Sequence, residues 1–147
     1  MFLSGTVVVL VVVLAGQAFA VSNTGTQNGN QITVTATNPS GPTIQCTGLN
    51  QRSTGGNVYF ILVSYMCQYQ DTAGTWHQFD TPPSTSKYNA NSSGTGYYTV
   101  RPCDSLPSGN WYVRGQADGY WKTCDTCQHN TYSPPKIYTT KFQITCG

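Results

Sequence analysis

The sequence predicts an all-β fold, an antiparallel sandwich of about seven strands, and three observations support this prediction. Thr, Tyr, Val, Gly, Asn and Ser are abundant, whereas Glu is absent and Lys and Ala are few. This bias favours strands and turns over helices. Short apolar or alternating segments recur between Gly-, Pro- and Asn-rich turns, as in sandwiches. No segment shows a convincing helical pattern.

The N-terminal residues 1–20 have the features of a signal peptide. Their apolar run over 7–14 is too short to span a bilayer, and Ala18-Phe19-Ala20 has the form of a cleavage site. No Lys or Arg precedes the run, so an uncleaved N-terminal anchor is the alternative. We expect a secreted, extracellular protein without a membrane span after signal cleavage. Residues 21–30 would form a flexible tail, and 31–147 a single β-sandwich domain.

The first half of the domain contains four predicted strands. Segment 31–37 alternates apolar and polar residues and ends at a Pro/Gly-rich turn, and 43–49 is a weaker candidate. Segment 58–70 is nearly continuously apolar at its centre, as expected for a central strand buried on both faces. Residues 71–74 form a turn, and 75–79 return as the second strand of a hairpin.

Three further strands are predicted at 97–101, 110–117 and 137–146, after a long Ser/Asn/Gly/Pro-rich connection. The sequence from Leu106-Pro107-Ser108-Gly109 into 110–117 resembles the E–F region of fibronectin type III and immunoglobulin-like domains. There, a Leu-x-x-Gly turn leads into a strand whose Tyr closes the "tyrosine corner". The resemblance covers about a sixth of the mature chain and implies a seven-stranded immunoglobulin/fibronectin-III-like antiparallel sandwich stapled by disulfides.

In this resemblance Tyr112, or less favourably Trp111, fills the corner. The chain departs from antibody-type domains at Arg114, where those domains have a Cys. The resemblance therefore concerns the architecture and implies no catalytic or ligand-binding residue.

The six cysteines divide into two groups on this strand order. Because strand direction alternates, four fall at or toward one pole of the sandwich and two fall in the 118–136 connection at the other. Disulfides persist in exported proteins and need closely spaced Cα atoms. We therefore expect a Cys124–Cys127 bridge and two bridges among the other four cysteines. Our preferred pairs are Cys67–Cys103 and Cys46–Cys146.

The connection 118–135 is the predicted binding site, because long loops in compact domains are usually functional or disordered. It is rich in Tyr, Trp, Asn and Ser, the residues of adaptable binding loops. The connection after 43–49 would add Asn50, Gln51, Arg52 and Asn57 at the same pole. The candidate binding residues are Tyr120, Trp121, Lys122, His129, Tyr132 and Arg52. The alternative is an inert loop whose aromatic rings pack on the sandwich.

The tryptophans suggest glycan binding, since Trp76, Trp111 or Trp121 could stack on sugar rings. Trp111 lies on a predicted strand, where it is expected in the core, so Trp121 in its polar loop is the better candidate. Cys124, Cys127 and His129 lack a clear fourth ligand for zinc. We expect no metal and no cofactor.

The remaining composition narrows the class of function. A net charge of +2 without a basic run does not favour nucleic acid. The sequence has no hydrolase, metalloprotease or phosphate-loop motif, so we expect no enzyme. The expected function is a secreted binding module that contacts a protein, glycan or surface. The rivals are a self-associating structural protein, such as a matrix, coat or filament subunit, and a secreted inhibitor or toxin.

Overall fold

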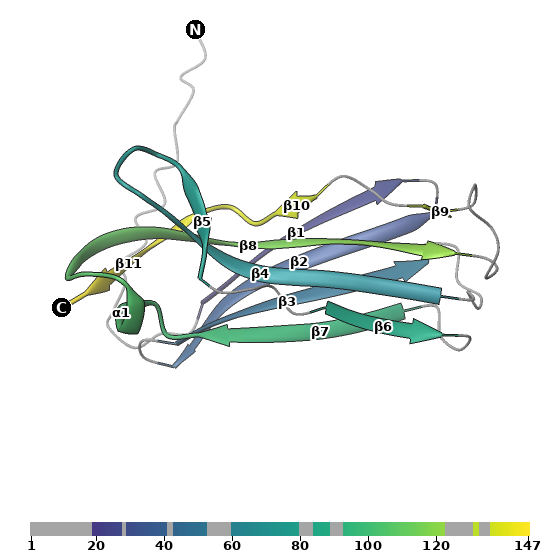
Figure 1. Cartoon of the computed structure of the whole chain (residues 1–147), viewed down its shortest axis with the longest axis horizontal. Coiled ribbons are helices and arrows are strands. Elements are labelled where there is room, and N and C mark those ends of the chain that lie inside the picture. Colours follow the sequence, from purple (N-terminus) through teal and green to yellow (C-terminus); the bar gives the residue numbers. More distant parts are fainter. Residues whose placement is uncertain are drawn as a thin grey trace, which may run out of the picture.

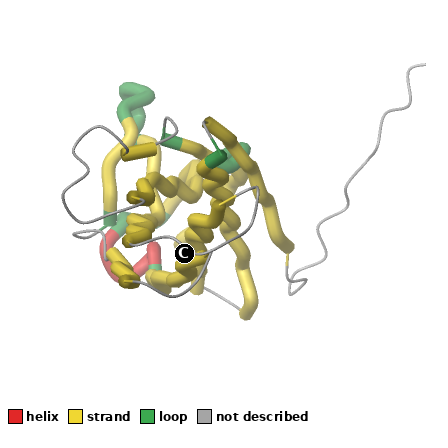
Figure 2. Tube along the Cα trace, turned by 90° about the vertical axis from the view of Figure 1, so that its right-hand side faces the viewer, coloured by secondary structure: helices red, strands yellow, loops and turns green. Residues whose placement is uncertain are grey.

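The computed structural model describes residues 19–27, 29–40, 43–52, 60–79, 84–88, 93–122, 131–132 and 136–147. These ranges form an all-β sandwich of two antiparallel sheets (Figure 1). Figure 2 shows the molecule end-on, with the strands running toward the viewer. Eleven strands lie in these ranges, nine of them with three or more residues. The predicted fold class is therefore confirmed, although the predicted strand count was too low.

The first sheet has the strand order β1-β2-β3-β7. Its side chains alternate between the core and the outer face, so that Ile32, Val34 and Ala36 are buried while the Thr residues between them are partly exposed. This is the alternation that predicted a strand at 31–37. The strands are β1 (Phe19–Gln27), β2 (Asn30–Ser40), β3 (Thr43–Arg52) and β7 (Ser93–Val100).

The second sheet is built around β4 (Phe60–Gln70) and β8 (Gly109–Lys122), which pair antiparallel from Phe60↔Lys122 to Gln70↔Tyr112. The central position of β4 matches its apolar sequence. Shorter strands pair with these two: β6 (Ser84–Tyr88) and β5 (Trp76–Gln78) with β4, and β9 (Thr131–Tyr132), β10 (Ile137–Tyr138) and β11 (Phe142–Cys146) with β8.

The sheets approach closely where Tyr65 of β4 packs over two glycines of the first sheet. Gly48 and Gly96 are register partners on β3 and β7. A Cβ at either position would collide with the Tyr65 side chain. The pair therefore makes room for a large aromatic ring in the core. Tyr65 shares this cluster with Ile32 and Val63.

A buried amide also ties the sheets together. Asn50 of β3 is fully buried, and its Nδ2 donates hydrogen bonds to two backbone oxygens of the second sheet, that of Leu62 at 2.6 Å and that of Tyr120 at 3.1 Å. The expectation that Asn50 lies in a binding loop was wrong. It continues the inward-facing alternation of β3, and the strand runs on to Arg52.

The described residues contain the disulfides Cys46–Cys67 and Cys103–Cys146. The expected group of four cysteines is confirmed, but the preferred pairing within it was wrong. Cys46 on β3 and Cys67 on β4 both face the core from opposite sheets, and both are buried. Cys103 lies beside the end of β11 instead. Cys124 and Cys127 lie outside the described residues.

Two further segments differ from the prediction. The segment 21–30 was expected to be a loose tail, but β1 occupies most of it and pairs with β2 from Phe19↔Asn38 to Gln27↔Asn30. Between β7 and β8, one helical turn, α1 (Pro102–Ser105), starts with Pro at its first position, where a missing N–H costs nothing. None of the helices in the described ranges has the length and apolar character that a membrane crossing requires.

Candidate functional site

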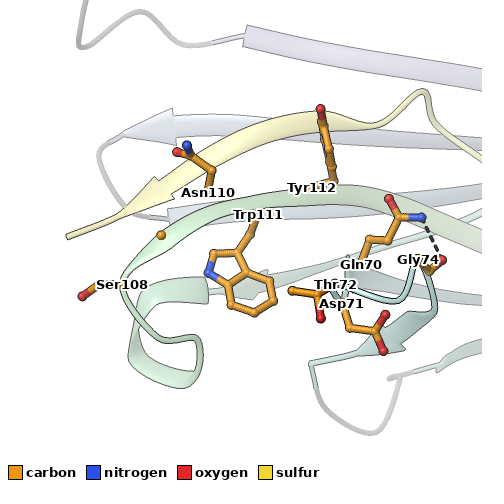
Figure 3. A pocket seen from close by; sticks show the side chains of 9 residues that line it. Gln70, Asp71, Thr72, Gly74, Ser108, Asn110, Trp111 and Tyr112 are labelled. Atoms are coloured by element: carbon orange, nitrogen blue, oxygen red, sulfur yellow. Dashed lines mark hydrogen bonds between the residues drawn. The ribbon is translucent and has the colours of Figure 1, made fainter.

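A hollow of about 490 Å³ lies where the β4–β5 hairpin meets the start of β8 (Figure 3). This is the end of the sandwich that carries α1 and the C-terminus (Figure 1), called here the α1 end. The opposite end, which carries β9, is the β9 end. The hollow is lined by Gln70, Asp71, Thr72, Gly74, Ser108, Gly109, Asn110, Trp111 and Tyr112.

One wall is the β4–β5 turn, which the sequence predicted at 71–74. The Asp71 backbone N–H donates to the Thr75 oxygen at 2.9 Å, and the Gly74 N–H donates to the Asp71 oxygen at 3.0 Å. Gly74 has a φ of 88°, a conformation that favours glycine. The Asp71 side chain reinforces the turn, because Oδ1 accepts a hydrogen bond from the Thr75 N–H at 2.8 Å.

The Asp71 carboxylate also accepts a hydrogen bond from the His77 ring. Its Oδ2 lies 2.7 Å from His77 Nε2. The hydrogen bond from His77 and then the backbone N–H of Thr75 hold the pKa of Asp71 below its ordinary value. The hollow therefore has a carboxylate that stays ionised in mild acid and is held in a fixed position.

The other wall is Trp111, held in place by two contacts. Its Nε1 donates a hydrogen bond to the Pro107 oxygen at 2.9 Å, and its ring meets the Tyr69 ring edge-on at 6.0 Å between centroids. Tyr112, the favoured residue for a corner bond, is instead 42% exposed, with Lys141 Nζ 4.2 Å from its ring centroid. The less favoured choice, Trp111, makes the bond back to the preceding turn.

Apart from Asp71, the polar side chains that line the hollow with Trp111 carry neutral amides and hydroxyls. Asn110 Oδ1 accepts a hydrogen bond from the Thr145 hydroxyl at 2.8 Å, and within the described ranges its amide N–H groups are available to a ligand. Gln70 Nε2 donates to the Gly74 oxygen at 2.8 Å. Thr72 and Ser108 are exposed at the rim. The arrangement combines a held aromatic ring with several neutral hydrogen-bonding groups.

The described residues among the predicted binding residues lie at the β9 end, where four of them form two separate pairs. Arg52 lies over the Trp121 ring at 5.3 Å from its centroid, and Lys122 Nζ lies 5.9 Å from the Tyr120 ring centroid. The chain from Tyr120 to Lys122 is strand β8, however, and not a loop. Tyr132 pairs through its backbone with Trp121. His129 lies outside the described residues.

The interpretation of Trp121 as a sugar platform was wrong. It is 4% exposed and packs with Ile61 in a small cluster of the core. Trp111, which was expected in the core, is partly exposed and lines the hollow. The position of each Trp along the strand could have predicted this difference in exposure. Trp111 follows directly after a turn, at the start of β8, whereas Trp121 belongs to the inward-facing residues farther along the strand.

Within the described ranges, no three His, Cys, Asp or Glu side chains cluster as possible metal ligands. No family model matches the chain, and the searches of curated proteins and of solved structures likewise give no match. The functional argument therefore starts from the hollow itself.

Proposed function

We propose that the chain is a secreted, non-catalytic binding module of the immunoglobulin/fibronectin-III-like class. The strand order supports the class, since β2-β3-β7 corresponds to strands A, B and E, and the G, F, C and C′ order corresponds to β10/β11-β8-β4-β5. The Trp111–Pro107 bond replaces the tyrosine corner. One departure from antibody domains is that the core disulfide joins β3 to β4 and not B to F.

The proposed ligand is a neutral glycan bound in the hollow at the α1 end. The observation that carries this proposal is the partly exposed Trp111 ring, which lines the hollow together with Asn110 and the 71–74 turn. A sugar ring offers an apolar C–H face and a rim of hydroxyls. The first packs on an aromatic ring, and the second exchanges hydrogen bonds with amide and hydroxyl groups. The volume of the hollow falls in the range of small-molecule sites.

The charged groups of the hollow favour binding without catalysis. Asp71 is the one carboxylate among the lining residues of the hollow, and it is occupied by His77 and Thr75. Glycoside cleavage ordinarily uses a pair of carboxyl groups. A single engaged carboxylate suits an acceptor for sugar hydroxyls better than an acid–base pair. The disulfides Cys46–Cys67 and Cys103–Cys146 suit an oxidising, extracellular setting.

The experiment is binding of the fluorescently labelled protein to an array of neutral oligosaccharides. Trp111→Ala should abolish the signals, and Asn110→Ala should weaken them while leaving the fold intact. Trp76→Ala is the matched control, because Trp76 stacks on Arg114 at 4.0 Å and does not line the hollow. It should bind normally.

Two results would contradict this proposal. One is an array without any signal above background. The other is binding that survives Trp111→Ala but is lost in Tyr120→Ala, which would locate recognition at the β9 end, where the sequence first indicated it.

A further inference from the structure

Most side chains on the outer face of the first sheet carry a hydroxyl or an amide, and they form a regular grid. Outward-facing residues of its four strands fall in four rows across the sheet, set by the strand register. Ten of the fifteen positions that follow the expected cleavage site are Thr or Ser. The rows are Thr37–Gln45–Thr99, Ser22–Thr35–Thr47–Tyr97, Thr24–Thr33–Leu49–Thr95 and Thr26–Gln31–Gln51–Ser93. We call this surface the hydroxyl grid.

The hydroxyl grid carries no charge. Arg52 is the one charged residue in the four strands, and it follows the last row, with its guanidinium over Trp121. The second sheet differs sharply, because β8 alone carries Arg114, Asp118 and Lys122. Exposed sheet faces normally contain interspersed charges, so the composition of the grid is not explained by solubility.

The spacing of the grid is set by sheet geometry. Side chains at i and i+2 on one strand lie about 6.7 Å apart, and neighbouring strands lie about 4.8 Å apart. Hydrogen bonds between neighbouring strands also hold hydroxyls in place within the rows. Ser22 Oγ lies 2.8 Å from Thr35 Oγ1, and Thr24 Oγ1 lies 2.9 Å from Thr33 Oγ1. The grid is therefore a two-dimensional lattice of donors and acceptors.

The side-chain chemistry of the hydroxyl grid limits the kind of partner that can bind there. An apolar partner would bury many hydroxyls without hydrogen bonds, which is costly. A charged partner would find no opposite charge. A fitting occupant is neutral, repeats in two dimensions and both donates and accepts hydrogen bonds at each site. Each Thr also presents a methyl group beside its hydroxyl, which orders water next to it.

We propose that the hydroxyl grid binds ice. An ice surface is an uncharged lattice of donors and acceptors, with oxygen repeats close to the two spacings of the sheet. Sheet twist displaces the outer rows relative to any plane. The contact is therefore centred on β2 and β3, where Thr33, Thr35, Thr37 and Thr47 lie together.

The test is growth arrest of a single ice crystal held just below its melting point in a solution of the folded protein. The wild-type chain should shape the crystal and arrest its growth. Thr35→Lys and Thr47→Lys, each placing a long charged side chain at the centre of the grid, should lose the arrest. Thr140→Lys is the matched control, since Thr140 is exposed between β10 and β11 and gains the same charge. It should arrest growth like the wild type.

Circular dichroism and thermal melts identify any Lys variant that fails to fold. If one of the two central variants fails to fold, the growth measurement with the other one tests the proposal. Ice growth that the wild-type protein leaves unchanged overturns the proposal, as does normal arrest by both central variants. A further contradictory result is a wild-type dimer in sedimentation that Thr35→Lys dissociates without any effect on ice. That result would make the grid a surface for self-association.

Discussion

The two disulfides should respond very differently to a reductant added to the folded protein. Cys46 and Cys67 are 0% and 1% exposed and join the two sheets across the core. Cys103 is only half-buried and lies on the single turn of α1, where it pairs with Cys146. Thiol–disulfide exchange needs access to a sulfur. The Cys103–Cys146 bridge should therefore open under native conditions, and Cys46–Cys67 only when the chain unfolds.

The magnitude of the effect follows from the loops that the bridges close. The sequence separations are 21 for Cys46–Cys67 and 43 for Cys103–Cys146. The loop-entropy relation then gives about 3.3 and about 4.0 kcal/mol of stabilisation, respectively. Opening the accessible bridge alone should therefore remove about 4 kcal/mol, a large share of the usual stability of a domain. The protein with one bridge open should remain folded but unfold at lower denaturant.

The assay is timed reduction, alkylation and peptide mass spectrometry, followed by urea denaturation of the singly reduced protein. Cys103 and Cys146 should be alkylated first and together, with Cys46 and Cys67 protected until urea reaches the unfolding transition. Equal alkylation rates for all four cysteines in the folded protein would refute the buried position of the core bridge. Native peptides joining Cys67 to Cys103 would refute the pairing itself.

Three further predictions concern single residues. Asn50→Ala should lower the free energy of unfolding by about 2 to 3 kcal/mol, because two carbonyls lose its amide; an unchanged urea midpoint would contradict this. His77→Ala should raise the pKa of Asp71 toward 3.8 in an NMR titration, since the His77 hydrogen bond is the main cause of its lowering. The stability from ionised Asp71 is present above pH 3.8 and lost as pH falls through the folded pKa; an unmoved pKa would contradict the pair. Burial raises the pKa of Asp118, so Asp118→Asn should raise the melting temperature at neutral pH but not below pH 3.8. An equal rise at both pH values would contradict this reasoning.

Most strands could be predicted because the alternation of apolar and polar residues is visible within each short segment of sequence. Residues 31–37 repeat with period two, and the structure places β2 there. The apolar centre of 58–70 became the central strand β4. The turn predicted at 71–74 is present, with the Asp71 side chain accepting a hydrogen bond from the Thr75 N–H and Gly74 at a positive φ. Period and turn chemistry were sufficient for these elements.

The predicted disulfide pairing was wrong because it rested on which end of the sandwich each cysteine occupies. It took no account of which face of its sheet each cysteine side chain points from. Cys46 follows Ile44 at the inward-facing period of β3, so its sulfur points to the opposite sheet. Cys67 does the same on β4. Applying the two-residue period to the cysteines would have indicated an inter-sheet bridge. The pole argument alone leaves the choice of partners open.

The N-terminal strand and the hollow were harder to predict for a different reason. Segment 19–27 has little apolar character, and it is ordered by pairing with β2 through polar rows such as Thr24↔Thr33. Such pairing depends on a neighbour that the local sequence does not reveal. The hollow likewise joins a hairpin to a strand start about 40 residues later. Its parts were visible in the sequence, but not that they would meet.

The glycan proposal is tested most directly by the three indole N–H signals in a two-dimensional NMR spectrum. Neutral trisaccharides of glucose, mannose or N-acetylglucosamine are titrated into the isotope-labelled protein, with each indole assigned by a Trp→Phe variant. The Trp111 signal should shift in a saturable manner with at least one sugar, while those of Trp76 and Trp121 stay in place. Saturable shifts at Trp76 or Trp121 alone, or none at any indole, would contradict the assignment of the binding site to the hollow.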